Sequence, residues 1–169
     1  MIYKFIVLSD IHWGAMDSYT MYDNLQLILE FIKQKKDSLD FVVISGDYFD
    51  YRLQLNSKTA LLAIKWLDQL VNTCKDANVK KIRIFKGTRE HDNDQLEVFR
   101  STYECDDSYL KIFNPTTSEE LLPGLRCVYC PDENMNLEEY HRTYYDKFIP
   151  YPNIGFFHGN FDVILPDIE

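Results

Sequence analysis

The sequence predicts an α/β layered domain whose first half forms a mainly parallel sheet. Short runs of β-type apolar residues alternate with longer stretches whose apolar residues recur at helical spacing, which is typical of β-α-β units. The 169 residues suffice for one domain with a hydrophobic core. Hydrophobic residues make up 46% and aromatic residues 15% of the chain, a composition that favours a globular fold containing strands.

The first β-α-β unit is expected within the first 44 residues. Residues 3–8 form an apolar run that ends at Ser9 and predicts a buried strand. Apolar residues spaced three and four apart predict a helix from about Tyr19 to Lys36. Residues 41–44 are continuously apolar and predict a second strand, which Gly46 ends.

The alternation continues through residue 103. Asn56 or Ser57 is a suitable N-cap for a helix that reaches about Ala77. Residues 81–85 predict a third strand, and Gly87 ends it. A short helix is expected over residues 94–103, with Asp92 or Asn93 as its cap.

The remaining residues predict short strands and one more helix. Strands are expected over residues 110–113, 125–129 and 154–157, and turns at Pro115, Pro123 and Gly124 separate the first two. Helical spacing over residues 138–148 predicts a helix that Pro150 and Pro152 end.

Charge and cysteine content limit the environment and the partners. The net charge is −9, and an acidic chain binds nucleic acid poorly without bound cations, a local basic face or a partner. Lys80, Lys81, Arg83 and Lys86 form a modest basic stretch, for which DNA contact is not the favoured interpretation. We expect a cytoplasmic protein, because the four cysteines show no disulfide pattern and the sequence has no signal peptide and no membrane-spanning run. Cys127 and Cys130 are expected to be core thiols.

Four acidic and histidine clusters each follow a predicted strand. They are Asp10-Ile11-His12, the Gly46–Asp50 run, the Gly87–Asp92 run and His158-Gly159-Asn160. Each cluster alone is explained about as well by an ordinary turn or a structural histidine. Because strand ends bring distant residues around one crevice, their conjunction indicates a site for divalent metal ions.

The residue types suggest separate roles. Asp10 and His12 are two residues apart, so strand geometry would direct both side chains to one metal. Gly46 allows a sharp turn before Asp47, whose carboxylate can bridge two cations. His91 can donate a proton to a leaving group, and Asp50 would orient it.

The ordered clusters resemble those of the calcineurin-like metallophosphoesterase superfamily. Two motifs, Asp-x-His-x-Gly at residues 10–14 and Gly-Asp-x-Phe-Asp at residues 46–50, resemble its nuclease branch, which consists of the SbcD-type DNA repair subunits and their phage counterparts. The resemblance implies an α-β-β-α sandwich over residues 1–169. It also implies that Asp10 and His12 bind the first metal, that Asp47 bridges both metals and that His158 binds the second. His91 and Asp50 would be the catalytic pair, and two Mn²⁺ ions the cofactors.

The sequence departs from this family pattern at two points. The third cluster is two residues longer than Gly-Asn-His and lacks the Asn ligand, for which Glu90 is the expected replacement and Asn93 a weaker candidate. No Gly-His-x-His follows His158, so we expect the chain to be the N-terminal portion of a longer protein, incomplete at its C-terminus.

Three functions remain open at this point. The first is a metal-dependent hydrolase acting on DNA, as an exonuclease or endonuclease subunit. Such a subunit would work with an SbcC-like coiled-coil ATPase through the missing C-terminal region, and it would form a homodimer. The second is a phosphoesterase acting on small phosphodiesters or phosphoproteins, because the same metal pair serves both reactions. The third is a structural or interaction module that is catalytically incomplete.

Overall fold

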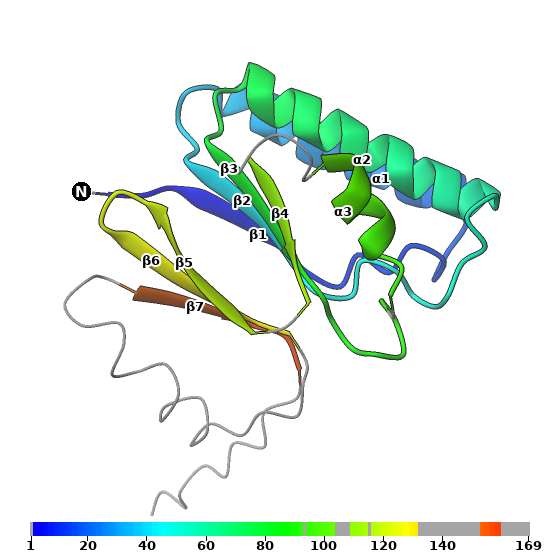
Figure 1. The fold of residues 1–169 in the computed structure, drawn as a ribbon. Helices are drawn as coiled ribbons and strands as arrows, with labels where there is room; N and C mark the ends of the chain where they lie inside the picture. Colours follow the sequence, from blue (N-terminus) through cyan, green and yellow to red (C-terminus); the bar gives the residue numbers. More distant parts are fainter. Residues whose placement is uncertain (1, 93, 104–108, 115, 132–152, 160–169) are drawn as a thin grey trace, which may run out of the picture.

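The computed structural model describes residues 2–92, 94–103, 109–114, 116–131 and 153–159. Two sheets face each other, and helices cover the outer face of the first (Figure 1). In chain order the elements are β1 (Phe5–Leu8), α1 (Ser18–Gln34), β2 (Phe41–Ser45), α2 (Lys58–Asp76), β3 (Lys81–Phe85), α3 (Glu97–Tyr103), β4 (Leu110–Phe113), β5 (Thr117–Leu122), β6 (Leu125–Cys130) and β7 (Asn153–Phe157).

The first sheet has the order β1-β2-β3-β4 and is entirely parallel. The second has the order β5-β6-β7, in which β5 and β6 form an antiparallel hairpin and β6 pairs with β7 in parallel. The described residues therefore form an α-β-β arrangement, which confirms the predicted α/β layers. The helix predicted over residues 138–148 lies outside the described residues.

Strand β2 shows how one sequence serves both layers. Val42 and Ile44 pack in the core between the sheet and the helices, whereas Phe41 and Val43 pack in the core between the two sheets. All four are fully buried. Alternate residues of a strand point to opposite faces, so a continuous apolar run is what a central strand of this arrangement requires.

The two long helices begin at capped residues. The Asp17 carboxylate accepts the N–H groups of Tyr19 and Thr20 at the start of α1, and the Ser57 hydroxyl accepts that of Ala60 at the start of α2. The Ser57 cap agrees with the sequence prediction. No helix among the described residues is both long and apolar enough to cross a membrane.

Four local predictions are wrong. Strand β1 is not buried, because it forms the edge of its sheet and leaves Phe5 and Val7 exposed. Strand β5 was not predicted, because Glu119 and Glu120 are residue types seldom found in strands. Helix α3 begins at Glu97 instead of residue 94, since residues 94–96 form turns. Asp92 does not cap this helix, because its carboxylate accepts backbone hydrogen bonds elsewhere.

A buried ion pair joins the two sheets. The Arg83 side chain on β3 is 1% exposed and binds the Glu119 carboxylate on β5 through two nitrogens, one of them 3.1 Å from Oε2. Lys80 pairs with Asp40 at 2.6 Å. Arg83 and Lys80 of the basic stretch around β3 are thus paired with acidic residues of the protein itself.

Cys127 and Cys130 are core residues, as predicted. Together with Cys74 they are buried and form no disulfide, and Cys105 lies outside the described residues. Burial raises the pKa of the Cys127 thiol to about 12, which leaves little reactive thiolate at neutral pH.

Candidate metal centre

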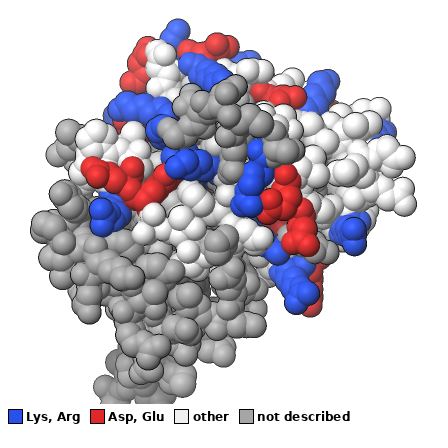
Figure 2. All heavy atoms as spheres, viewed as in Figure 1, with Lys and Arg blue, Asp and Glu red and all other residues white. Residues whose placement is uncertain are grey.

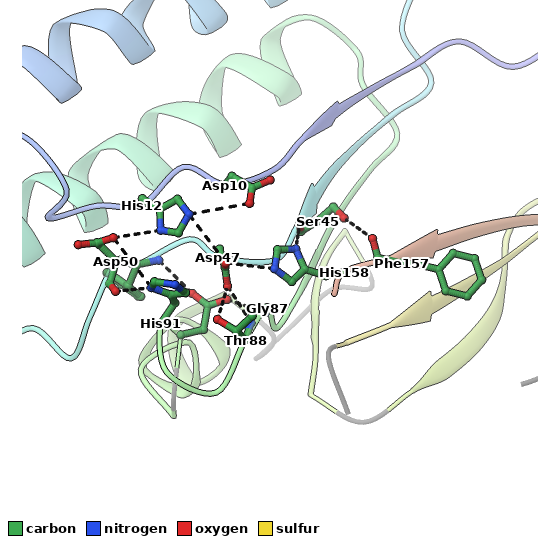
Figure 3. A network of polar contacts seen from close by, with 12 residues as sticks. Asp10, His12, Ser45, Asp47, Asp50, Gly87, Thr88, His91, Phe157 and His158 are labelled. Atoms are coloured by element: carbon green, nitrogen blue, oxygen red, sulfur yellow. Dashed lines mark hydrogen bonds and ion pairs between the residues drawn. The ribbon is translucent and has the colours of Figure 1, made fainter. Parts of the chain in front are cut away.

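Four loops from the carboxyl ends of strands meet at one edge of the sheets. Asp10 and His12 follow β1, Asp47 follows β2, and His91 lies in the turn after β3. His158 follows β7 and approaches from the second sheet (Figure 3). The structure therefore brings together residues from all four clusters; Asn160 of the fourth lies outside the described residues.

Backbone hydrogen bonds hold the first two loops side by side. The N–H of His12 donates to the Asp47 carbonyl at 2.9 Å, and that of Trp13 donates to the Tyr48 carbonyl at 2.9 Å. The N–H of Asp50 returns a bond to the Trp13 carbonyl at 3.1 Å. These bonds continue the β1–β2 pairing beyond the strands, so the loops are fixed by the main chain.

Three candidate ligands have left-handed backbone conformations. The φ angles are +53° at Asp10, +53° at His12 and +48° at Asp47. L-residues other than Asn and Asp rarely adopt such angles, so the cost, about 1–2 kcal/mol, falls mainly on His12. The expectation that strand alternation aligns Asp10 with His12 is therefore wrong. Left-handed turns after β1 bring their side chains to 3.8 Å of each other.

The ligand atoms form two groups that share Asp47. One group holds Asp10, Asp47 and His158, and the other holds His12, Asp47 and His91; the ligand atoms within each group lie within 4.8 Å of one another. The resemblance paired Asp10 with His12 instead. A carboxylate common to two sets of ligands is the arrangement that a pair of cations requires.

Thr88 fixes the orientation of the shared carboxylate. Its N–H and its hydroxyl donate to Oδ1 of Asp47 at 2.7 and 3.0 Å. Oδ2 instead lies 3.1 Å from Nε2 of His158 and 3.8 Å from Nε2 of His12. Asp47 therefore directs a single oxygen toward the histidines, and Thr88 stands directly after Gly87, where the family pattern has Asn.

A carbonyl selects the ligand nitrogen of His158. Its Nδ1 lies 2.9 Å from the Ser45 carbonyl oxygen, an acceptor that requires a proton on Nδ1. Nε2 then carries the lone pair and faces Asp47. A backbone acceptor of this kind is the usual means of orienting a metal-binding imidazole.

Asp50 contacts both remaining histidines, but not as the sequence suggests. Nδ1 of His91 makes a short hydrogen bond to the main-chain carbonyl of Asp50. The Asp50 carboxylate is 3.9 Å from Nδ1 of His91 and only 3.2 Å from Nδ1 of His12. The backbone of Asp50 thus orients His91, while its side chain lies nearer His12.

This environment favours the protonated form of His91. The hydrogen bond to the Asp50 carbonyl raises the pKa of His91 above its ordinary value, against the opposing effect of burial. The negative charges of Asp47, Asp50 and Asp92 raise the pKa further. With Nδ1 bound to Asp50, the second nitrogen, Nε2, is the one able to transfer a proton.

Asp92 joins the loops that carry the other residues. It is fully buried, and its two oxygens accept the N–H groups of Phe49 at 2.9 Å and Gly87 at 2.7 Å. Burial raises the pKa of Asp92, although these two hydrogen bonds oppose the shift. Sequence analysis missed this structural role, for which the only signal was the acidic residue directly after His91.

Glu90 is exposed and belongs to neither ligand group. Among the described residues, Thr88 instead reaches the centre at this loop. The structure thus gives no support to Glu90 as the replacement for the missing Asn, and Asn93 lies outside the described residues.

The residues present fit divalent cations. Carboxylate oxygens combined with neutral imidazoles suit ions of the Mn²⁺, Fe²⁺ and Zn²⁺ type. Nδ1 of His12 is buried and makes no hydrogen bond of acceptable geometry, although Oδ1 of Asp50 lies 3.2 Å away. Carboxylates from Asp10, Asp47 and Asp50 converge beside the three histidines, a concentration of negative charge that bound cations would neutralise.

We expect Gly87→Ala to disrupt the centre. A Cβ at position 87 would lie 2.1 Å from both the backbone nitrogen and Oδ1 of Asp47. The collision must displace Asp47, so calorimetric titration with Mn²⁺ should show loss of tight binding, and stability should fall by about 1–3 kcal/mol. Gly124→Ala is the control for metal binding: its φ of +75° makes alanine strained there, but the added Cβ meets no other atom and cannot displace Asp47, so Mn²⁺ affinity should stay unchanged. Unchanged Mn²⁺ affinity in Gly87→Ala would contradict the packing.

We expect Thr88→Val to weaken metal binding without unfolding the protein. Valine keeps the shape and the N–H bond but removes the hydroxyl bond to Asp47. Loss of a group that orients a metal ligand lowers metal affinity by about 10–100-fold, which calorimetry with Mn²⁺ can measure. Thr88→Ser keeps the hydroxyl and should bind as tightly as the wild type. Equal affinities in all three proteins would show that this hydrogen bond has no role.

The match to a known protein family covers the region that carries the candidate ligands. The family model for calcineurin-like phosphoesterases matches residues 3–160, a span that contains both ligand groups. No curated protein matches the sequence.

Proposed function

The chain belongs to the calcineurin-like phosphoesterase family, and we propose from this premise that it hydrolyses phosphodiester bonds of DNA with two divalent cations. The family supports metal-dependent hydrolysis of phosphoesters. The observation that carries the two-cation proposal is the sharing of Asp47 by the two ligand groups. We propose Mn²⁺ as the cation, since the resemblance to the nuclease branch implies it and the mixed carboxylate and imidazole ligands suit it.

The proposed roles of the side chains follow from their contacts. Asp10, Asp47 and His158 would hold one cation, and His12 would join Asp47 at the other. Cations bound there would supply a polarised water and neutralise charge on the phosphate. His91 would hold a proton at Nε2 for the leaving oxygen, and the Asp50 carbonyl keeps the ring in place.

The surface charge bears on how DNA would bind. Figure 2 shows Lys and Arg interspersed with Asp and Glu over the described part of one face. Such a face attracts the phosphate backbone weakly, since nonspecific affinity grows with the number of Lys and Arg contacts. We therefore propose that DNA binding depends on the cations and on a partner. By resemblance to the nuclease branch, that partner is an SbcC-like coiled-coil ATPase, and the protein forms a homodimer.

A cleavage assay tests this proposal. The protein is incubated with linear duplex DNA in Mn²⁺, in Mg²⁺ and in EDTA, and with a cyclic nucleotide in parallel. The proposal expects cleavage of DNA in Mn²⁺ and none in EDTA. Turnover of the cyclic nucleotide without cleavage of DNA would instead favour a phosphoesterase for small substrates. Failure of calorimetry to detect Mn²⁺ binding would favour a structural module.

A further inference from the structure

A cavity of about 460 Å³ is lined by residues that follow Asp50 and His91 closely in the sequence. Residues 52–55 form one side of it, and residues 94, 95 and 98 form the other. Its volume falls within the range of roughly 300–1,000 Å³ typical of small-molecule sites. None of the roles described above uses this cavity.

Gln95 connects the two sides of the cavity to the loops of the metal centre. Its side-chain oxygen accepts the N–H of Leu53 at 2.6 Å. Its side-chain nitrogen lies 3.0 Å from the Tyr51 carbonyl oxygen and 3.4 Å from that of His91. Because residues 51–53 directly follow Asp50, the cavity wall is continuous with the loops that carry Asp50 and His91. A substituent on a phosphate held at the centre would therefore lie next to the cavity.

The lining combines one available positive charge with apolar surface. Arg52 is exposed and forms no ion pair with any described residue, whereas Asp94 lies 3.8 Å from Nζ of Lys86. Leu55 at the rim is 57% exposed, and the neighbouring Tyr51 is 50% exposed. The lining itself has no aromatic residue, so a base would pack against Leu55 and Val98, while the guanidinium of Arg52 would bind a phosphate.

We propose that this cavity receives a nucleoside attached to the scissile phosphate, and that Arg52 pairs with the neighbouring phosphate. This proposal rests on the proposed function and gives a structural basis for a preference for nucleotides and nucleic acids over phosphoproteins. The cavity thus supplies the specificity that metal ligands common to many phosphoesterases do not.

Ligand binding tests the proposal separately from catalysis. The full chain in MnCl₂ is titrated by calorimetry with methyl phosphate, thymidine 5′-monophosphate and thymidine 3′-monophosphate, which differ only in the ester group. We expect at least one thymidine monophosphate to bind about tenfold more tightly than methyl phosphate, a difference of about 1.4 kcal/mol. Val98→Phe fills the cavity and Leu55→Ser removes an apolar wall, so both should reduce this preference.

Thr102→Phe is the matched control, because it adds the same ring to an exposed position of α3 that does not line the cavity. It should keep the preference. The proposal is overturned if methyl phosphate binds as tightly as both nucleotides, or if the preference persists in both cavity variants. Hydrolysis of bis(p-nitrophenyl) phosphate is measured with the same protein. Hydrolysis without a preference for the nucleotides would refute only the proposal about the cavity. A preference for the nucleotides without hydrolysis would refute only the proposed function.

Discussion

Asp47→Asn is expected to abolish hydrolysis and to remove both metal sites at once. Asp47 is the one residue present in both ligand groups, and its Oδ2 faces His158 and His12. An amide is neutral and a weaker ligand, so the charge stabilisation that two cations provide is lost. That stabilisation amounts to several kcal/mol, and the rate should fall by about 10³-fold or more. Phosphodiester hydrolysis and calorimetric Mn²⁺ binding measure the two effects.

The control for this substitution is Asp23→Asn, which removes the same charge at an exposed position of α1. Its activity and Mn²⁺ binding should match those of the wild type. If Asp47→Asn still bound two Mn²⁺ ions tightly, the shared-carboxylate arrangement would be wrong. Asn tolerates the left-handed backbone at this position, so the fold is expected to survive.

Arg83→Ala is expected to give the largest loss of stability, up to about 3–5 kcal/mol, because it removes the bidentate partner of the partly buried Glu119 carboxylate and leaves Lys111, 3.6 Å away, as the cation beside it. Marginally stable domains have only about 5–15 kcal/mol in total, so this variant should unfold at much lower denaturant concentration. Equilibrium unfolding in urea, monitored by circular dichroism, measures the change. A loss below about 1 kcal/mol would show that the pair is solvated instead of buried.

A double variant separates the pair from its surroundings. Arg83→Met with Glu119→Leu replaces both charges by apolar side chains, and such replacements are often close to neutral. Arg83 also donates to the Tyr109 carbonyl, and the Tyr129 hydroxyl donates to Glu119, so some cost remains. We expect the double variant to be more stable than Arg83→Ala. Equal or lower stability would show that the loss in Arg83→Ala comes from the hydrogen bonds to Tyr109 and Tyr129 and not from the Glu119 charge left without Arg83.

The first sheet and its helices could be predicted because each depends on local pattern. Residues 41–44 are apolar on both faces, as a strand covered on both sides requires. Buried residues of α1 recur at helical spacing, at Met21, Leu25, Leu29 and Ile32. The convergence of the clusters was also predictable, because parallel strands place their carboxyl ends at one edge.

The rest depended on contacts between residues far apart in the sequence. Strand β5 contains Glu119 because Arg83, on another sheet, neutralises it. Contacts of the Asp50 main chain leave no trace in residue type, so the carbonyl that binds His91 could not be anticipated. Thr88 was overlooked for a similar reason, since a threonine after glycine suggests an ordinary turn until Asp47 lies against it.

The left-handed residues bear on whether this centre is a working site or an evolutionary remnant. His12 has φ +53°, an angle that glycine adopts freely and histidine does not. Once metals were no longer needed, replacement of His12 by Gly or Asn would relieve the strain, and drift would favour it. A chain that keeps His12 in this conformation bears a cost in stability that a purely structural module has no reason to bear. Backbone strain at the ligands thus favours a functional metal centre on grounds independent of the ligand chemistry.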